Sequence, residues 1–184
     1  YKQRKPLFKG IFLEINDQDQ PSELRNNELL ALGERLSTLM MAALLKSQKI
    51  SCKLLFAEEL LHLDENRFPN YERLAEQVKQ KRIGNDGCEI YIVQGFICAD
   101  HLGNIDNLDR GGSDYSASIF GKAIGADEIQ IWTDIDGMHN CDPRFVENTK
   151  PIEYLNFEEA AELAYFGAKI LHPLSILPAM VANI

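Results

Sequence analysis

The sequence predicts an α/β fold, in which helices pack against parallel strands. Two observations in its second half indicate this. A glycine turn leads into an apolar-periodic run that closes at Gly125, as expected for a helix. A short, bulky run of Ile129, Ile131 and Trp132 then has the character of a buried parallel strand, and a burst of polar residues follows it. Helix and strand with the polar groups gathered in the connecting loops are the layout of an α/β active site.

Composition limits the class of protein. A chain of 184 residues with 45% apolar and 26% charged content can form one globular domain, predicted over residues 1–184. The net charge of −9 argues against a nucleic-acid partner. No apolar run approaches the ~20 residues that span a bilayer, and no signal-peptide pattern is present, so we expect a cytoplasmic protein without a membrane partner. The scattered cysteines predict reduced thiols and no metal site: they are Cys52, Cys88, Cys98 and Cys141.

The first half of the chain begins with a basic patch and no Met, which we interpret as the start of a fragment of a longer protein. A long helix is predicted from Ser22 to Ser47, because apolar residues recur at intervals of three and four. We expect this stripe to lie in the core; its members are Leu24, Leu29, Leu32, Leu36, Leu39, Met40, Ala43 and Leu44.

Shorter elements are predicted after this helix. The expected order is a strand at Lys53–Ala57, a helical turn at Glu58–Leu63, a loop at Asn66–Asn70, a helix at Tyr71–Arg82, a strand at Glu89–Ala99 and a loop or hairpin at Asp100–Leu108. Gly95 inside the apolar run Glu89–Ala99 is consistent with a central parallel strand that backbone or ligand approaches closely.

The glycine turn at Arg110–Asp114 is a candidate anion site. A helix beginning near Ser113 has backbone N–H groups without partners, and two glycines before it let a ligand approach them. Arg110 adds a planar, bidentate grip on a carboxylate or phosphate, and Asp114 offers a carboxylate. The alternative is that Ser113 or Asp114 merely caps the helix, and the residues alone leave both interpretations open.

The polar burst after Trp132 is the second candidate loop, because ligands of open α/β sheets bind beyond the carboxyl ends of the strands. Some of its residues serve the turn itself. The set comprises Thr133, Asp134, Asp136, Gly137, His139, Asn140, Asp142 and Arg144.

The C-terminal part predicts two helices. Asn156 caps the first one together with Glu159, three residues on, and this helix runs to Gly167. The second helix extends from Leu174 to Ala182, after Pro173. Lys169 lies between them, and from the residues alone a lysine near a helix end is ordinarily a surface residue.

Four segments together resemble a known family: LGERLST, LDRGGSDYSA, QIWTDIDGMHNCDPR and FEEAAELAYFGAKILHP. In this order they are similar to the catalytic domain of aspartate kinases, in the amino acid kinase superfamily, over roughly Asn27 to Ile184. The resemblance implies an incomplete three-layer α/β/α sandwich with a mainly parallel central sheet. It also implies ATP-dependent phosphorylation of the side-chain carboxylate of L-aspartate, the first step of lysine, threonine and methionine biosynthesis. ATP with Mg²⁺ and a homo-oligomeric full-length protein are implied as well.

The resemblance also assigns roles to residues. Asp114 is the residue that would organise the catalytic centre. The predicted L-aspartate site consists of Glu34, Arg110, Gly111, Gly112 and Ser113. The predicted ATP site consists of Thr133, Asp134, His139, Arg144 and Lys169.

The sequence departs from the family pattern at several points. The family's N-terminal KFGGTS segment, with its catalytic lysine, does not occur in these 184 residues, so we expect this chain alone to be inactive or nearly so. The sequence ends at Ile184, before the ACT domains that follow in the family. Asp109 stands where glycine is usual, and His139 replaces a more usual tyrosine. Two other interpretations stay open: a different carboxylate or carbamate kinase of the same superfamily, and a non-catalytic folding or dimerisation fragment.

Overall fold

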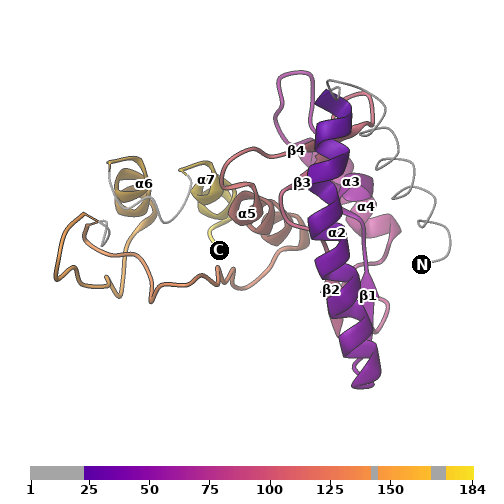
Figure 1. The fold of residues 1–184 in the computed structure, drawn as a ribbon, viewed down its shortest axis with the longest axis horizontal. Coiled ribbons are helices and arrows are strands. Elements are labelled where there is room, and N and C mark those ends of the chain that lie inside the picture. The colour runs from indigo at the N-terminus through magenta and orange to yellow at the C-terminus, as the bar shows by residue number, and fades with distance from the viewer. Residues whose placement is uncertain (1–22, 142–144, 167–172) are drawn as a thin grey trace. The chain divides into compact units, whose positions relative to one another are not determined.

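The computed structural model describes residues 23–141, 145–166 and 173–184. The chain divides into two compact units, unit 1 ending at Asn107 and unit 2 beginning at Leu108 (Figure 1).

Unit 1 combines one long helix with short helices and strands. Its elements are α2 (Glu23–Ser47), β1 (Cys52–Leu54), α3 (Ala57–Leu60), α4 (Tyr71–Gln80), β2 (Ile90–Ile92), β3 (Ile97–Ala99) and β4 (Ile105–Asn107). β1 pairs with β2 in parallel, and β3 forms an antiparallel hairpin with β4. The α/β class is confirmed, as are the predicted helices of this unit and the hairpin after residue 99.

The prediction of one continuous strand over Glu89–Ala99 is wrong. The run forms β2 and β3, which belong to two different sheets. Between them Phe96 adopts a left-handed backbone with φ of 68°, and the Ile97 N–H donates to the carbonyl of Gly95 at 2.7 Å. This tight turn breaks the strand geometry, so the glycine marks a change of direction.

The prediction that the apolar stripe of α2 lies in the core is also wrong for most of its members. Leu32 is buried, but Met40 and Leu44 are 72% and 55% exposed. The inward face is formed instead by smaller and polar residues, among them Ala31, Arg35 and Ala42. α2 packs against β1 and β4 through this face (Figure 1). Alanines allow a helix to approach a sheet closely, so packing selects this face over the more apolar one.

The core of unit 1 lies where α2, α3 and β3 meet. Ala31, Ala57 and Ile97 form a cluster with at most 1% exposure. Leu74 of α4 is fully buried and fixes that helix, as predicted. α4 begins at an N-cap, Asn70, whose side chain accepts the Arg73 N–H at 2.9 Å.

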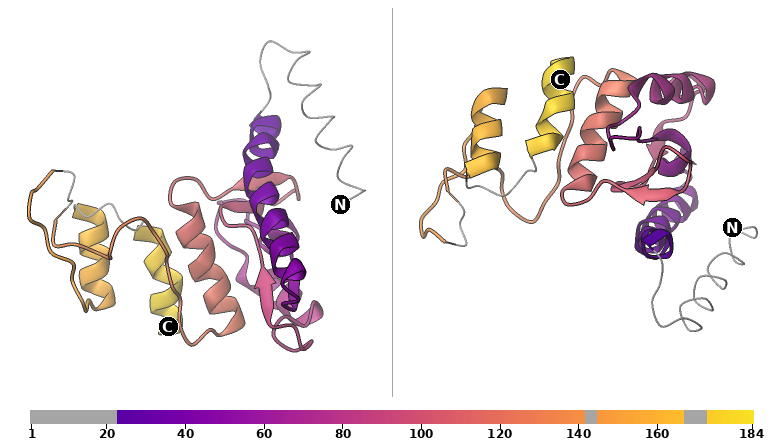
Figure 2. Two further views of the ribbon diagram at one scale, coloured as in Figure 1. Left: turned by 60° about the horizontal axis from the view of Figure 1, so that its bottom comes forward. Right: turned by 90° about the horizontal axis from the view of Figure 1, so that it is seen from above.

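Unit 2 is built on three helices: α5 (Gly112–Ile124), α6 (Phe157–Phe166) and α7 (Pro173–Ala182). α7 packs against both α5 and α6, as the row of helices in Figure 2 shows. The predicted end of α5 is confirmed, because Gly125 caps it with φ of 63°. The predicted capping box of α6 is confirmed as well. Asn156 Oδ1 accepts the Glu159 N–H at 2.8 Å, and Glu159 Oε2 accepts the Asn156 N–H at 2.9 Å.

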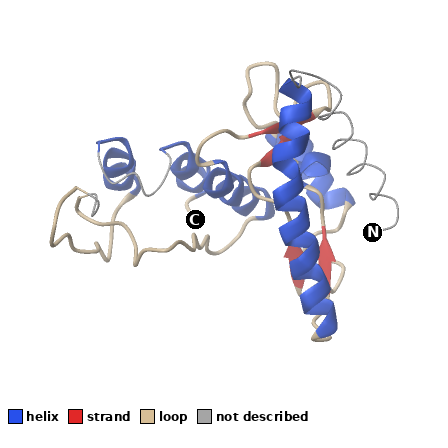
Figure 3. Cartoon of the chain, in the orientation of Figure 1, coloured by secondary structure: helices blue, strands red, loops and turns tan. Residues whose placement is uncertain are grey.

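The predicted strand at Ile129–Trp132 is not formed. The segment carries no strand in Figure 3, where the strands drawn lie in unit 1. Ile129 and Ile131 are half-buried, whereas Trp132 is 89% exposed. A strand exists only with a hydrogen-bonded neighbour, and no described residue supplies one for this run.

All four cysteines are free, as predicted. In the described ranges no helix is long and apolar enough to cross a bilayer. The same ranges contain no group of three or more His, Cys, Asp or Glu side chains placed to hold a metal ion.

His62 makes the stability of unit 1 dependent on pH. Burial, together with the charge of Arg73, lowers the pKa of His62 below its ordinary value of 6.5. The unfolded chain therefore takes up a proton at a pH where the folded chain does not, and the free energy of unfolding falls as the pH drops below about 6.5. We expect His62→Leu to flatten this slope between pH 7 and pH 5, as measured by urea unfolding. A slope unchanged by the substitution would contradict this origin.

Candidate functional site

The turn before α5 is held by two left-handed residues. Asp109 and Gly111 have φ of 57° and 75°, and the Gly112 N–H donates to the Asp109 carbonyl at 3.1 Å. Glycine adopts this conformation without strain, and aspartate is among the few other residues that tolerate it. Glycine and aspartate are therefore both suited to position 109.

The same turn leaves donors available for an anion. The backbone N–H groups of Ser113 and Asp114 have no acceptor among the described residues, and the exposed Arg110 guanidinium has no partner there either. The N-cap of α5 is Gly111, with no side-chain capping bond. The interpretation that Ser113 or Asp114 merely caps the helix is therefore wrong. Donors, guanidinium and helix dipole together suit a carboxylate or phosphate.

Asp114 differs from the other carboxylates of this turn in its burial. It lies half-buried in the first turn of α5, and desolvation raises the pKa of its carboxyl above the ordinary value of 3.8. A carboxylate that is partly removed from water beside an anion site is a candidate functional group.

The second predicted loop presents Thr133 and Asp134 on its surface. Both are exposed, and the Thr133 hydroxyl donates to Asp134 Oδ1 at 3.1 Å. Their side chains thus bond to each other and stay accessible to a ligand.

His139 holds the second loop together. It is buried, with Nδ1 at 2.9 Å from Thr149 Oγ1 and Nε2 at 2.6 Å from Asp136 Oδ1. The hydrogen bond from His139 lowers the pKa of Asp136. Close by, the Ile152 N–H donates to the Met138 carbonyl at 2.7 Å. Both ring nitrogens of His139 are therefore engaged inside the loop, and a contact with ATP would have to use the ring face or replace one of these bonds.

Glu34 lies on α2, in unit 1. Its half-buried carboxylate has no hydrogen-bond or ion-pair partner among the described residues. Its backbone carbonyl, in contrast, accepts from Thr38 Oγ1 at 2.8 Å and from Ser37 Oγ at 3.0 Å. The structure thus groups Arg110–Asp114 at one helix terminus, with Glu34 in the other unit. The predicted Arg144 and Lys169 lie outside the described residues.

No sequence motif indicates Gln94, which is fully buried between β2 and β3. It bonds to Ala57 and Thr38, which belong to two different helices. Its signal in the sequence was a single amide side chain inside the apolar run Glu89–Ala99.

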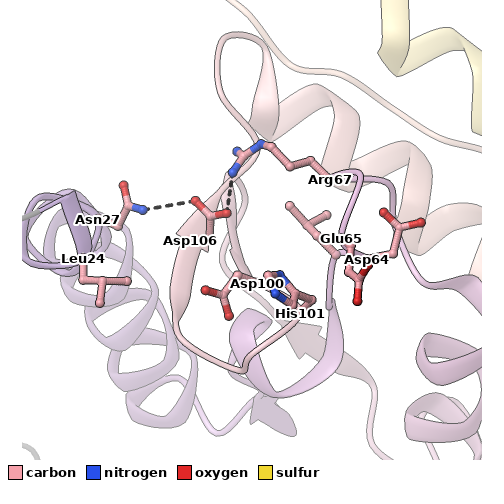
Figure 4. Close-up of a pocket in the computed structure, with 9 residues that line it drawn as sticks. Leu24, Asn27, Asp64, Glu65, Arg67, Asp100, His101 and Asp106 are labelled. Carbon is pink, nitrogen blue, oxygen red and sulfur yellow. Dashed lines mark hydrogen bonds and ion pairs between the residues drawn. The ribbon is translucent and has the colours of Figure 1, made fainter.

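A charged pocket of about 240 Å³ in unit 1 contains none of the predicted site residues (Figure 4). The Asp106 carboxylate accepts from Arg67 Nη1 at 2.7 Å and from Asn27 Nδ2 at 3.1 Å. Asp100 accepts the Leu102 and Asn104 N–H groups of the β3–β4 turn at 2.9 and 2.8 Å. These carboxylates hold loops in place, which accounts for their presence in the pocket without a functional role.

Comparison with known proteins shows the class to which this fold and site belong. The profile of the amino acid kinase family matches residues 5–184, and the chain belongs to this family. Among curated relatives, it is 36% identical to the lysine-sensitive aspartokinase 3 of Escherichia coli over 162 residues. It is 40% identical to the chloroplastic aspartokinase 1 of Arabidopsis thaliana over the same length.

Solved structures give the same result. The chain is similar to E. coli aspartokinase III in complex with aspartate and ADP, with a TM-score of 0.86, 32% identity and 98% of this chain covered. It also matches that enzyme in complex with lysine and aspartate, with a TM-score of 0.80. The chain spans 41% of the aspartate–ADP structure, 36% of E. coli aspartokinase 3 and 28% of the Arabidopsis relative.

The left-handed turn at Asp109 can be tested by stability. We expect Asp109→Ala to lower the free energy of unfolding by about 1 kcal/mol, because alanine tolerates positive φ poorly. Asp109→Asn is the matched control, since asparagine tolerates this conformation, and it should stay within about 0.5 kcal/mol of the native protein. Urea unfolding measures both, and equal stability of the two variants would refute the requirement.

Proposed function

We propose that residues 1–184 are part of the catalytic domain of an aspartate kinase. The full-length protein would transfer the γ-phosphoryl group of ATP to the side-chain carboxylate of L-aspartate, giving 4-phospho-L-aspartate. The supporting observation is the turn at Arg110–Asp114, whose guanidinium and N–H donors lack partners among the described residues. A cytoplasmic location, predicted from the sequence, is part of this proposal.

Phosphoryl transfer to a carboxylate is a problem of bringing two anions together in line. Arg110 and the N–H groups at the start of α5 would neutralise and orient the substrate carboxylate. Glu34 would bind the α-ammonium group, because its carboxylate is not engaged by any described residue. One carboxylate and the α-ammonium group of L-aspartate would thus each meet an opposite charge, which would help to orient the substrate.

ATP would be held by the second loop and by Lys169, as the resemblance implies, with Thr133, Asp134, His139 and Arg144 in the loop. Asp114 would organise the centre, since burial makes its carboxylate responsive to neighbouring charges. In the part of the chain described here the protein offers no carboxylate cage for Mg²⁺. Mg²⁺ bound together with ATP would neutralise part of the phosphate charge.

Another carboxylate or carbamate kinase of the family is the second candidate, since the same turn suits any small carboxylate. Assays of the full-length protein with Mg-ATP and either L-aspartate or L-glutamate separate the two. We expect transfer to aspartate with at least tenfold higher kcat/KM. Equal use of both acceptors, or a preference for glutamate, would refute the proposal.

Arg110 should matter for the amino-acid substrate above all. We expect Arg110→Ala in the full-length protein to raise KM for L-aspartate about 10- to 100-fold, the loss of a charge-assisted pair of hydrogen bonds worth roughly 1.5–3 kcal/mol. Arg82→Ala is the control, because it removes another exposed guanidinium, one that bonds to the Asn85 carbonyl. Steady-state kinetics measure both, and similar KM values for the two variants would contradict the assigned role.

We also propose a homo-oligomer, and that α2 carries a contact between two copies. Every exposed residue between Leu29 and Leu44 is uncharged, so two copies can meet without burying a charge. Gly33 leaves a notch on this face, with no atom within 4 Å of the position of a Cβ. An antiparallel pair of helices crossing at Ser37 would place Met41 of one copy opposite that notch in the other.

A charge on this face should separate the copies. We expect Met40→Glu in the full-length protein to halve the mass of the smallest assembly, as measured by sedimentation. Lys46→Glu is the control, because it changes charge on the same helix outside the Leu29–Leu44 face and should leave the mass unchanged. If Met40→Glu lowers thermal stability but not mass, another part of the same chain covers this face and the proposed contact is wrong.

A further inference from the structure

A buried chain of hydrogen bonds connects α3 to the backbone of Glu34. Gln94, which has no solvent exposure, accepts the Ala57 N–H on Oε1 at 2.9 Å. Its Nε2 donates to Thr38 Oγ1 at 2.8 Å. A backbone N–H can only donate, so Ala57 fixes the amide orientation and directs Nε2 to Thr38.

The chain continues through the Thr38 hydroxyl. Because Oγ1 accepts from Gln94, its own proton is available to a carbonyl of the preceding turn. The carbonyl of Glu34 lies at 2.8 Å and that of Arg35 at 3.2 Å, so the shorter bond goes to Glu34. Threonine often bonds back in this way within a helix, but here the hydroxyl is itself held from the other side by a buried amide.

A second connection ties the next residue to the same short helix. Arg35 is 3% exposed, and its Nη2 lies 2.5 Å from Oε1 of Glu58 on α3. Ala57 and Glu58 are adjacent, as are Glu34 and Arg35. Two connections therefore join the segment of α2 around Glu34 to the start of α3: one runs through Thr38 and Gln94, and the other is the Arg35–Glu58 pair. The carboxylate of Glu34 itself makes no described contact.

We propose that Gln94 and Thr38 are positioning residues for Glu34. By holding its backbone carbonyl, they fix the rotation of α2 and with it the direction in which the Glu34 carboxylate meets the α-ammonium group of the amino-acid substrate. The inference rests on the proposed function, in which Glu34 binds that group. It explains how the direction of the Glu34 carboxylate is fixed. A helical side chain that is held only at its backbone moves its carboxylate whenever the helix rotates.

The test uses steady-state kinetics of the full-length protein. Thr38→Val removes the hydroxyl at nearly constant volume, and we expect it to raise KM for L-aspartate about 5- to 20-fold while KM for ATP changes less than twofold. Thr38→Ser keeps the hydroxyl and should return KM for aspartate to within twofold of the native value. Ser37→Ala is the matched control, because Ser37 also bonds to the Glu34 carbonyl but has no bond to Gln94; its effect should stay under twofold.

A pH profile adds a readout that a purely structural role would not move. In Gln94→Glu the carboxylate can still accept from Ala57, but it donates to Thr38 only when protonated, and burial raises the pKa of such a group. We therefore expect KM for aspartate in this variant to rise with increasing pH relative to the native protein. A parallel profile would overturn the role of the Gln94 donor.

A double-mutant cycle separates this inference from the proposed function. If Thr38 acts through Glu34, Thr38→Val should have less than a twofold further effect on KM for aspartate in the Glu34→Gln background. Full additivity would show that Thr38 acts elsewhere and would overturn the inference. If Glu34→Gln itself leaves KM for aspartate unchanged, the assigned role of Glu34 fails, and the positioning role fails with it. Thermal unfolding of each variant identifies any loss that comes from misfolding, and Thr38→Ser then serves as the folded comparison.

Discussion

Buried polar groups at the contact between α2 and its neighbours restrict the packing of unit 1. Gln94 and Arg35 are at least 97% buried, and a buried donor without a partner costs about 1–3 kcal/mol, more when it is charged. Their partners lie on α3 and α2, so Gln94 and the Nη2 group of Arg35 reach those partners only when these helices meet the β2–β3 turn in one register. Apolar burial drives the association, but it is nearly indifferent to a small rotation of α2. The polar groups select the rotation.

This constraint accounts for the exposed apolar face of α2. With Arg35 and Thr38 turned toward α3 and the β2–β3 turn, residues on the opposite side of the helix must point outward. Met40 and Leu44 lie there, together with Gly33. Counting apolar residues at helical spacing located the helix correctly, but it assumed that the most apolar face is the buried one. A helix whose inward face carries a salt bridge violates that assumption.

Local signals in the sequence predicted what depends on neighbouring residues. The capping box at Asn156 and the glycine that ends α5 involve contacts within four residues, and both were found. The segment Ile129–Trp132 was assigned as a strand, and such an assignment depends on a partner far away in the chain. Apolar, β-branched composition is compatible with a strand but cannot supply its neighbour. The break at Phe96 was missed for a related reason, because a left-handed phenylalanine has no signature in composition.

The candidate site shows the same division between local and distant information. The turn around Arg110 was identified because glycines, a guanidinium and a helix start are adjacent in sequence. The connection of Gln94 to Thr38 spans 56 residues, and no motif announces it. Within LGERLST the arginine and the threonine are held by distant partners, while Glu34, directly before the arginine, keeps its carboxylate unengaged in the described structure. The motif therefore combines a carboxylate of the type that suits an ammonium ligand with two residues whose distant partners hold this part of α2 in place.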